Sequence, residues 1–255
     1  MLVKMLQFVE IIEVKSGDEN NSMRYFQIYN DEELENLSFV NVLKIHKLAI
    51  ENCQRVKFQG VANVKVLQVN SCRLQNLEGI KKWNQLLELN LNENKLESVA
   101  ELENLTQLKS LSLRSNQIKN VDSLKGLVNL TSINLSWNHI QNVDLLKGLV
   151  NLTSINLSCN HNLNLDSLKG LVNLTSIDLS CNHNLNLDSL KGLVNLTSIN
   201  LQYNRIENVD SLEGLVDLKE LHLSGNKINN FSPIKNHPNF KNYLIDDYYI
   251  DIEFE

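Results

Sequence analysis

The stretch GLVNLTSINLSWNHIQNVDLLKG, from Gly126 to Gly148, decides how this chain folds. Its pattern, L-x-x-L-x-L-x-x-N-x-I-x-x-V-x-x-L-x-G-L, returns every 22 residues. The polar residue of the pattern recurs without a slip at Asn94, Asn116, Asn138, Asn160, Asn182, Asn204 and Asn226. Alternating polarity over five residues, followed by an asparagine that turns the chain, predicts a short strand leading into a loop.

A single 22-residue coil of this kind is not expected to fold alone. Burying its seven apolar side chains contributes on the order of 10–20 kcal/mol, whereas ordering its residues costs on the order of 20–40 kcal/mol. Stacking adds strand hydrogen bonds and shields both faces of each coil. The coils are therefore expected to form one elongated stack, in which the asparagine side chain serves backbone groups of neighbouring coils.

The repeats divide the chain into three expected parts. Residues 1–22 fit no repeat and are expected to form an N-terminal cap, and residues 23–232 form the solenoid, whose first two or three coils are degenerate. One of these early coils is short, with 19 residues from Leu48 to Leu67. Residues 233–255 are expected to form a C-terminal capping coil and an acidic, aromatic tail that either completes the cap or binds a partner.

These residues resemble the leucine-rich repeat superfamily over residues 45–232. The 22-residue form is similar to the bacterial internalins and to the nuclear regulatory subunit of protein phosphatase 1. The resemblance implies an α/β repeat solenoid, an arc or horseshoe with a parallel sheet on its concave face and short 3-10 or one-turn helices on its convex face. It also implies that the concave face binds another protein or peptide. Cys53 and Cys72 occupy the asparagine position, where this family accepts cysteine.

The convex turns carry a repeated aspartate and a repeated glycine, as in Asp122 and Gly126. The aspartate is expected to cap the turn, and the glycine to close it in a left-handed conformation. Stacking also places a column of aspartates beside a column of lysines such as Lys125. Of the two interpretations, an anion-binding stripe or two solvated columns that compensate each other, the second is favoured.

Two repeats break the pattern where an inward isoleucine is expected. They carry Asn162 and Asn184, each followed by a leucine, Leu163 or Leu185. The leucine is expected to take the inward place through a local bulge.

The expected binding surface lies on and beside the strands, whose middle positions are small and polar. The residues before the asparagines form a stripe that contains two aromatics. The residue after each asparagine is basic or a histidine, except for Gln117. Exposed aromatics beside arginine are typical of binding hot spots, although both rings could instead lie over neighbouring coils. The candidate residues are Trp137, Tyr203, His139, His161, His183, Arg205, Cys159, Cys181, Asp178, Arg114 and Glu93.

A zinc site is an alternative interpretation of part of this surface. Cys159, His161, Cys181 and His183 form two C-x-H pairs on adjacent coils, within reach of one tetrahedral ion if the side chains converge. The 22-residue separation and an evident duplication of these two repeats argue against it. The sequence therefore predicts no metal and no cofactor, and purified protein is expected to carry no stoichiometric zinc.

Composition narrows the classes of function. The formal net charge of −6 argues against nucleic acid as a partner. No stretch has the roughly 18 apolar residues of a membrane span, and the start of the chain lacks the apolar run of a signal peptide. The absence of cysteine clusters at the ends of the solenoid favours the cytoplasm, or the nucleus.

No catalytic motif accompanies the repeats, so enzyme activity is not expected. The sequence predicts a monomeric, non-enzymatic scaffold or adaptor that binds a protein or peptide on its concave face. A regulatory subunit that docks a protein phosphatase is one alternative. An exported surface adhesin is another.

Overall fold

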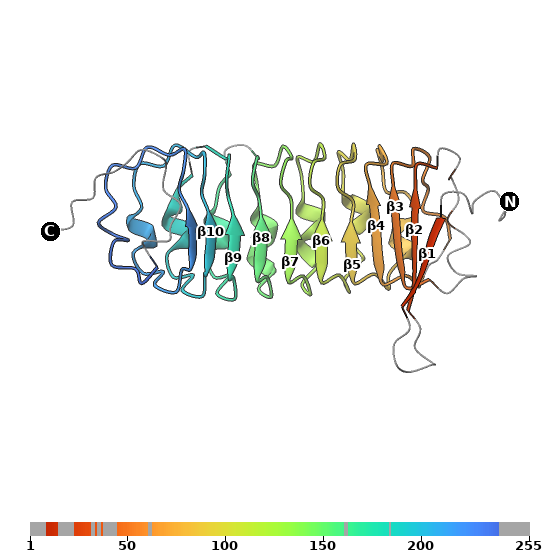
Figure 1. Cartoon of the computed structure of the whole chain (residues 1–255), viewed down its shortest axis with the longest axis horizontal. Coiled ribbons are helices and arrows are strands. Elements are labelled where there is room, and N and C mark those ends of the chain that lie inside the picture. The colour runs from red at the N-terminus through yellow and green to blue at the C-terminus, as the bar shows by residue number, and fades with distance from the viewer. Residues whose placement is uncertain are drawn as a thin grey trace.

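The structure, a computed structural model, describes residues 9–14, 23–31, 34, 37, 45–60, 63–160, 163–183 and 185–239. They form one eleven-stranded sheet whose strands follow the order of the sequence (Figure 1). β1 (Val9–Val14) pairs antiparallel with β2 (Met23–Tyr29), and all later neighbours pair in parallel. The remaining strands are β3 (Lys47–Glu51), β4 (Val66–Asn70), β5 (Glu88–Asn90), β6 (Ser110–Ser112), β7 (Ser132–Asn134), β8 (Ser154–Asn156), β9 (Ser176–Asp178), β10 (Ser198–Asn200) and β11 (Glu220–His222).

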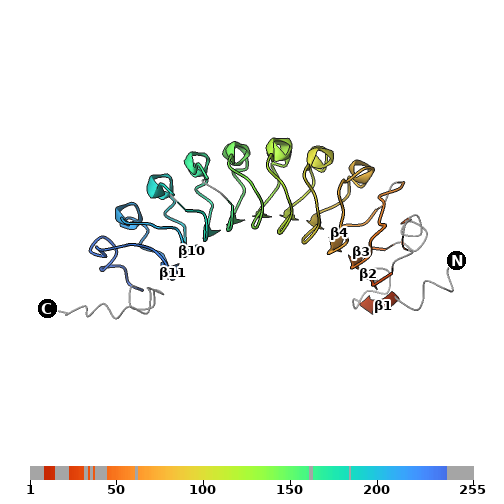
Figure 2. The ribbon, with the colours of Figure 1, turned by 90° about the horizontal axis from the view of Figure 1, so that it is seen from above.

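Short 3-10 segments alternate with the strands from β4 onward. Seen from above, the coils form an arc with the strands on its inner side and the 3-10 segments on its outer side (Figure 2). The predicted repeat solenoid is confirmed. The segments are η1 (Ile80–Lys82), η2 (Ala100–Leu102), η3 (Asp122–Gly126), η4 (Asp144–Gly148), η5 (Asp166–Leu168), η6 (Leu187–Leu190) and η7 (Asp210–Leu212).

The core is a continuous stack of aliphatic side chains between the two faces. Ile133, Ile155 and Ile177 lie in register on adjacent strands, and each is buried. Each asparagine of the repeat links two coils, as predicted. Asn138 Nδ2 donates to the carbonyls of Leu113 in the preceding coil and Leu135 in its own, at 3.0 and 3.1 Å.

The convex turns differ from the sequence prediction in how they are capped. Asp144 is the first residue of η4, and its N–H donates to Oδ1 of Asn142 at 2.7 Å. The side chain that satisfies the first N–H of the turn therefore belongs to the asparagine two residues earlier, and the aspartate side chain makes no cap hydrogen bond. The glycine prediction holds at Gly170 and Gly192, which have φ of 94° and 86°. It is wrong at Gly126, Gly148 and Gly214, which do not have a positive φ. At Gly126 and Gly148 the 3-10 turn extends through the glycine.

The leucines of the two irregular repeats both point toward the core, as expected, but they differ in how deeply they are buried. Leu163 is buried in the core, whereas Leu185 is partly buried and packs against it. Asn162 and Asn184 lie outside the described residues, so the bulge itself is not described.

The two ends of the solenoid are described in part. β1 covers the edge of β2 that would otherwise have unpaired backbone groups. Near the other end, Ile234 is buried, and the imidazole Nε2 of His237 lies 3.0 Å from the carbonyl oxygen of Glu213. Of the expected capping coil and tail, residues 233–255, the part from 240 to 255 lies outside the described residues. Within the described part of the chain, no helix has the length and apolar character to cross a bilayer.

Candidate functional site

The floor of the concave face is built from short polar side chains that bond to one another. On β7, Ser132 and Asn134 are half-buried on either side of the buried Ile133. Asn134 Oδ1 accepts from both the N–H and the hydroxyl of Ser136, at 3.0 and 2.7 Å. Asn156 repeats this bonding in the next coil, and Asp178 repeats it in the one after. The floor is thus ordered before any partner arrives.

The predicted stripe lies just beyond the strands rather than on them. Its members share a left-handed backbone with φ between 52° and 74°: Glu93, Ser115, Trp137, Cys159, Cys181, Tyr203 and Gly225. The backbone N–H of Trp137 still donates to the carbonyl of Ser158 in the next coil, at 2.9 Å. The parallel ladder therefore continues past the strand, and it holds a conformation that non-glycine residues rarely adopt.

Two aromatic side chains stand out on this stripe. Trp137 is 55% exposed and Tyr203 is 60% exposed. They occupy the same repeat position three coils apart, which corresponds to about 14 Å along the stripe at normal strand spacing. The Tyr203 ring leans over Gly225, where an added Cβ would clash with the ring. Glycine at this position is therefore required for the observed pose of the ring.

Between the aromatics lie two half-buried free thiols, Cys159 and Cys181. Burial raises the pKa of Cys159 to about 12, and its hydrogen bond with Cys181 acts in the same direction. The Asp178 carboxylate also raises this pKa, while the guanidinium of Arg114 opposes the effect. The Cys159 thiol is therefore protonated at neutral pH.

We predict that Cys159 reacts slowly with iodoacetamide, because the thiolate is the nucleophile. A pKa of about 12 instead of 9.0 lowers the thiolate fraction at pH 8, by roughly a thousandfold at ten per pKa unit. Alkylation in the native protein is expected to be at least a hundredfold slower than in urea, as followed by peptide mass spectrometry. The native rate should still rise above pH 10. A native rate that levels off near pH 9 would contradict the raised pKa.

The other candidates surround this stripe. His139, His183 and Arg205 are exposed in the position after each asparagine, and His161 lies outside the described residues. Arg114 is exposed beside the stripe. Glu93, itself a member of the stripe, accepts from the Ser71 hydroxyl at 2.9 Å. For the zinc alternative, the described part of the chain contains no group of three ligating side chains that could hold a metal ion.

The charges of the aspartate and lysine columns on the convex face compensate each other, in line with the interpretation that the sequence favoured. Lys147 pairs with Asp144 at 2.8 Å, and the same contact recurs in the next two coils at 2.6 and 2.7 Å. The Lys147 ammonium lowers the pKa of Asp144, and a hydroxyl of the next coil, from Ser167, adds to this effect. These lysines are paired with aspartates, so the convex face does not present a free anion-binding stripe there.

The coil geometry agrees with comparisons to known proteins. A "Leucine Rich repeat" profile matches residues 127–147, and "Leucine Rich repeats (2 copies)" matches residues 194–236. Internalin C2 of Listeria monocytogenes is 32% identical in sequence, with a TM-score of 0.65 over 68% of this chain and 76% of that one. The chain belongs to the leucine-rich repeat family. No curated protein sequence matches this leucine-rich repeat protein significantly.

Two further structures share the fold of this leucine-rich repeat protein. The Listeria monocytogenes internalin inlF is 17% identical, with a TM-score of 0.67 over 86% of this chain and 74% of that one. The ectodomain of the Arabidopsis thaliana receptor kinase GASSHO1/SCHENGEN3, solved in complex with Casparian strip integrity factor 2, is 20% identical, with a TM-score of 0.61. It aligns over 78% of this chain and 27% of its own length. Leucine-rich repeat proteins generally bind other proteins, and their fold is typically non-catalytic.

A row of exposed valines was not predicted from the sequence. Five valines at the same repeat position are about half exposed: Val128, Val150, Val172, Val194 and Val216. They lie in the segments that lead from the 3-10 turns to the strands. Their regular recurrence in the GLVNLT blocks was visible, but the sequence alone does not tell an outward valine from an inward one.

Proposed function

We propose that this protein is a non-enzymatic scaffold that binds a protein or peptide segment across its concave face. The observation that carries the proposal is the pair of exposed aromatics, Trp137 and Tyr203, at one repeat position. Two half-buried thiols lie between them, beside a floor of bonded polar side chains. This arrangement supplies apolar anchors separated by a shallow gap, next to hydrogen-bonding groups for a partner backbone.

The energetics favour a binding role for the two rings. Tryptophan and tyrosine are enriched among residues that cost 2 kcal/mol or more when they are truncated in an interface. Tyr203 does lean on the next coil, yet more than half of its surface stays exposed. A ladder hydrogen bond holds the left-handed backbone beneath each ring. Binding a partner therefore costs little further backbone conformational entropy at these residues.

The test is affinity capture from the native cell with a matched pair of double variants. Trp137→Ala with Tyr203→Ala is expected to reduce capture of the partner by at least tenfold. The control is Val150→Ala with Val216→Ala, which are 51% and 56% exposed and also three coils apart. The control should retain the partner, because these valines lie outside the concave face.

The outcomes discriminate the alternatives. Equal capture of the partner by both double variants would show that the two concave-face aromatics do not form the binding site. A phosphatase catalytic subunit lost only with the aromatic variant would support the regulatory-subunit alternative, and loss of other proteins would support a general adaptor. A third variant, Gly225→Ala, displaces the Tyr203 ring without removing it and should weaken capture less than the double variant.

We place the protein in the cytoplasm or nucleus, a proposal supported by its four free cysteines. The sequon asparagines are also engaged within the fold, since Asn151 Nδ2 donates to the carbonyl of Val128 at 2.9 Å. A tagged chain is expected to fractionate with intracellular proteins. Secretion, or glycans at Asn151, would favour the adhesin alternative.

A further inference from the structure

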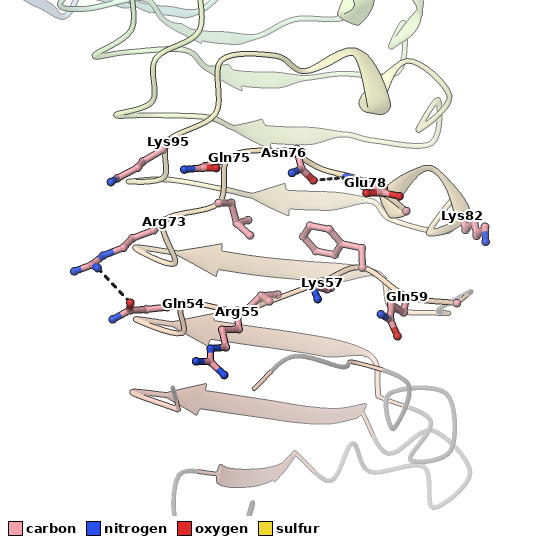
Figure 3. Close-up of a pocket in the computed structure, with 15 residues that line it drawn as sticks. Gln54, Arg55, Lys57, Gln59, Arg73, Gln75, Asn76, Glu78, Lys82 and Lys95 are labelled. Carbon is pink, nitrogen blue, oxygen red and sulfur yellow. Dashed lines mark hydrogen bonds between the residues drawn. The ribbon is translucent and has the colours of Figure 1, made fainter. Parts of the chain in front are cut away.

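A basic trough lies on one flank of the arc, among the coils that follow β3, β4 and β5 (Figure 3). It encloses about 940 Å³. The trough forms at the short coil. The described residues between β3 and β4 form no 3-10 segment there, whereas a 3-10 segment follows every strand from β4 to β10. The missing turn leaves a hollow between neighbouring coils.

Most of the charged residues that line the trough are cations. Its charged lining residues are five cations and one carboxylate, a surplus of four positive charges in a chain of formal net charge −6: Arg55, Lys57, Arg73, Lys82, Lys95 and Glu78. In the described part of the chain, none of Arg55, Arg73, Lys82 and Lys95 forms an ion pair. The convex lysines of η4 to η6 contrast with them, because each pairs with an aspartate of its own coil.

We propose that this trough binds an acidic segment of a partner protein in an extended conformation. The cations are spread along it: Arg73 and Lys95 project at the C-terminal ends of the strands, and Lys82, the last residue of η1, lies at the opposite end (Figure 3). A single phosphate would reach only one end. An extended chain with carboxylates on several residues can meet both ends.

The floor between the cations suits a peptide. It is formed by the apolar residues Val56, Phe58 and Leu74, which are nearly buried. Gly79 packs directly against the backbone of Phe58, because its φ of +91° and its approach to the Phe58 carbonyl leave no room for a side chain. A polynucleotide fits less well, since the trough offers no exposed ring for a base to stack on and the whole chain repels a long polyanion.

The experiment measures binding of a fluorescein-labelled nonapeptide, Glu-Leu-Glu-Tyr-Glu-Leu-Glu-Tyr-Glu, to the full chain by fluorescence anisotropy. Arg73→Glu with Lys95→Glu is expected to raise the Kd at least tenfold. The control, Lys219→Glu with Lys227→Glu, changes the net charge equally at exposed cations outside the trough and should raise the Kd less than twofold. Circular dichroism and the thermal midpoint establish that both variants fold.

Four further measurements complete the test, and one of them is the binding of a single-stranded 12-nucleotide DNA. The peptide with glutamine in place of glutamate should lose binding, and raising sodium chloride from 50 to 300 mM should weaken the binding of the acidic peptide. Trp137→Ala with Tyr203→Ala should leave the Kd unchanged, which separates this surface from the concave site. Equal weakening by both charge variants, equal binding of the glutamine peptide, or tighter binding of a single-stranded 12-nucleotide DNA would each overturn the proposal.

Discussion

Replacing Asn138 with alanine is expected to lower the free energy of unfolding by about 3–5 kcal/mol. The Asn138 amide donates to the carbonyls of Leu113, Leu135 and Ser136, and its oxygen accepts from the N–H of Ile118 at 3.0 Å. All of these groups lie where two coils meet. Each buried group left without a partner costs about 1–3 kcal/mol. Urea unfolding, followed by far-ultraviolet circular dichroism, measures the loss.

Two other substitutions serve as controls for this prediction. Asn138→Cys should cost less than Asn138→Ala, because cysteine fills the same place at Cys72, whose thiol lies 3.1 Å from the carbonyl of Asn70. Asn142→Ala removes two exposed hydrogen bonds, one from the N–H of Asp144 and one to its carboxylate, and should cost about 1 kcal/mol. A loss at Asn138 no larger than the loss at Asn142 would contradict the role of the asparagine column.

Replacing Trp83 with alanine is expected to cost about 3–5 kcal/mol, which is typical when a buried aromatic is truncated. Trp83 is fully buried, and its ring meets Phe58 edge to face at a centroid distance of 5.7 Å. The pair packs where the short coil lacks a 3-10 turn, so the surrounding chain has little else to fill the cavity. The urea midpoint should fall accordingly, with the slope of the transition unchanged.

Trp83→Phe is the matched control, and it is expected to cost about 1 kcal/mol. Trp83 Nε1 is the one buried side-chain nitrogen or oxygen in the described part of the chain that lacks a hydrogen-bond partner. Phenylalanine removes this unpaired donor, which offsets part of the lost packing. If Trp83→Phe were as destabilising as Trp83→Ala, ring packing against Phe58 would not explain the stability.

The concave site and the trough differ in how far the sequence predicts them. Trp137 and Tyr203 were predicted to share one stripe, because their common repeat position requires it. The trough was not predicted, although the 19-residue coil was evident. Its cations, such as Arg55, Arg73 and Lys95, come from three coils, and only the missing 3-10 turn brings them round one hollow.

The sequence by itself determined the solenoid, its buried aliphatic positions and its asparagine column, because each follows from a 22-residue period that every coil repeats. Tertiary structure alone decided the left-handed backbone at Trp137 and Cys159, since neither residue favours it. The ladder bond to the next coil imposes that conformation, as with the 2.9 Å contact from Trp137 to Ser158. The same holds for the pKa of Cys159, which depends on burial and on groups from neighbouring coils. Periodic burial is a local pattern, whereas strain and charge environment arise only when coils stack.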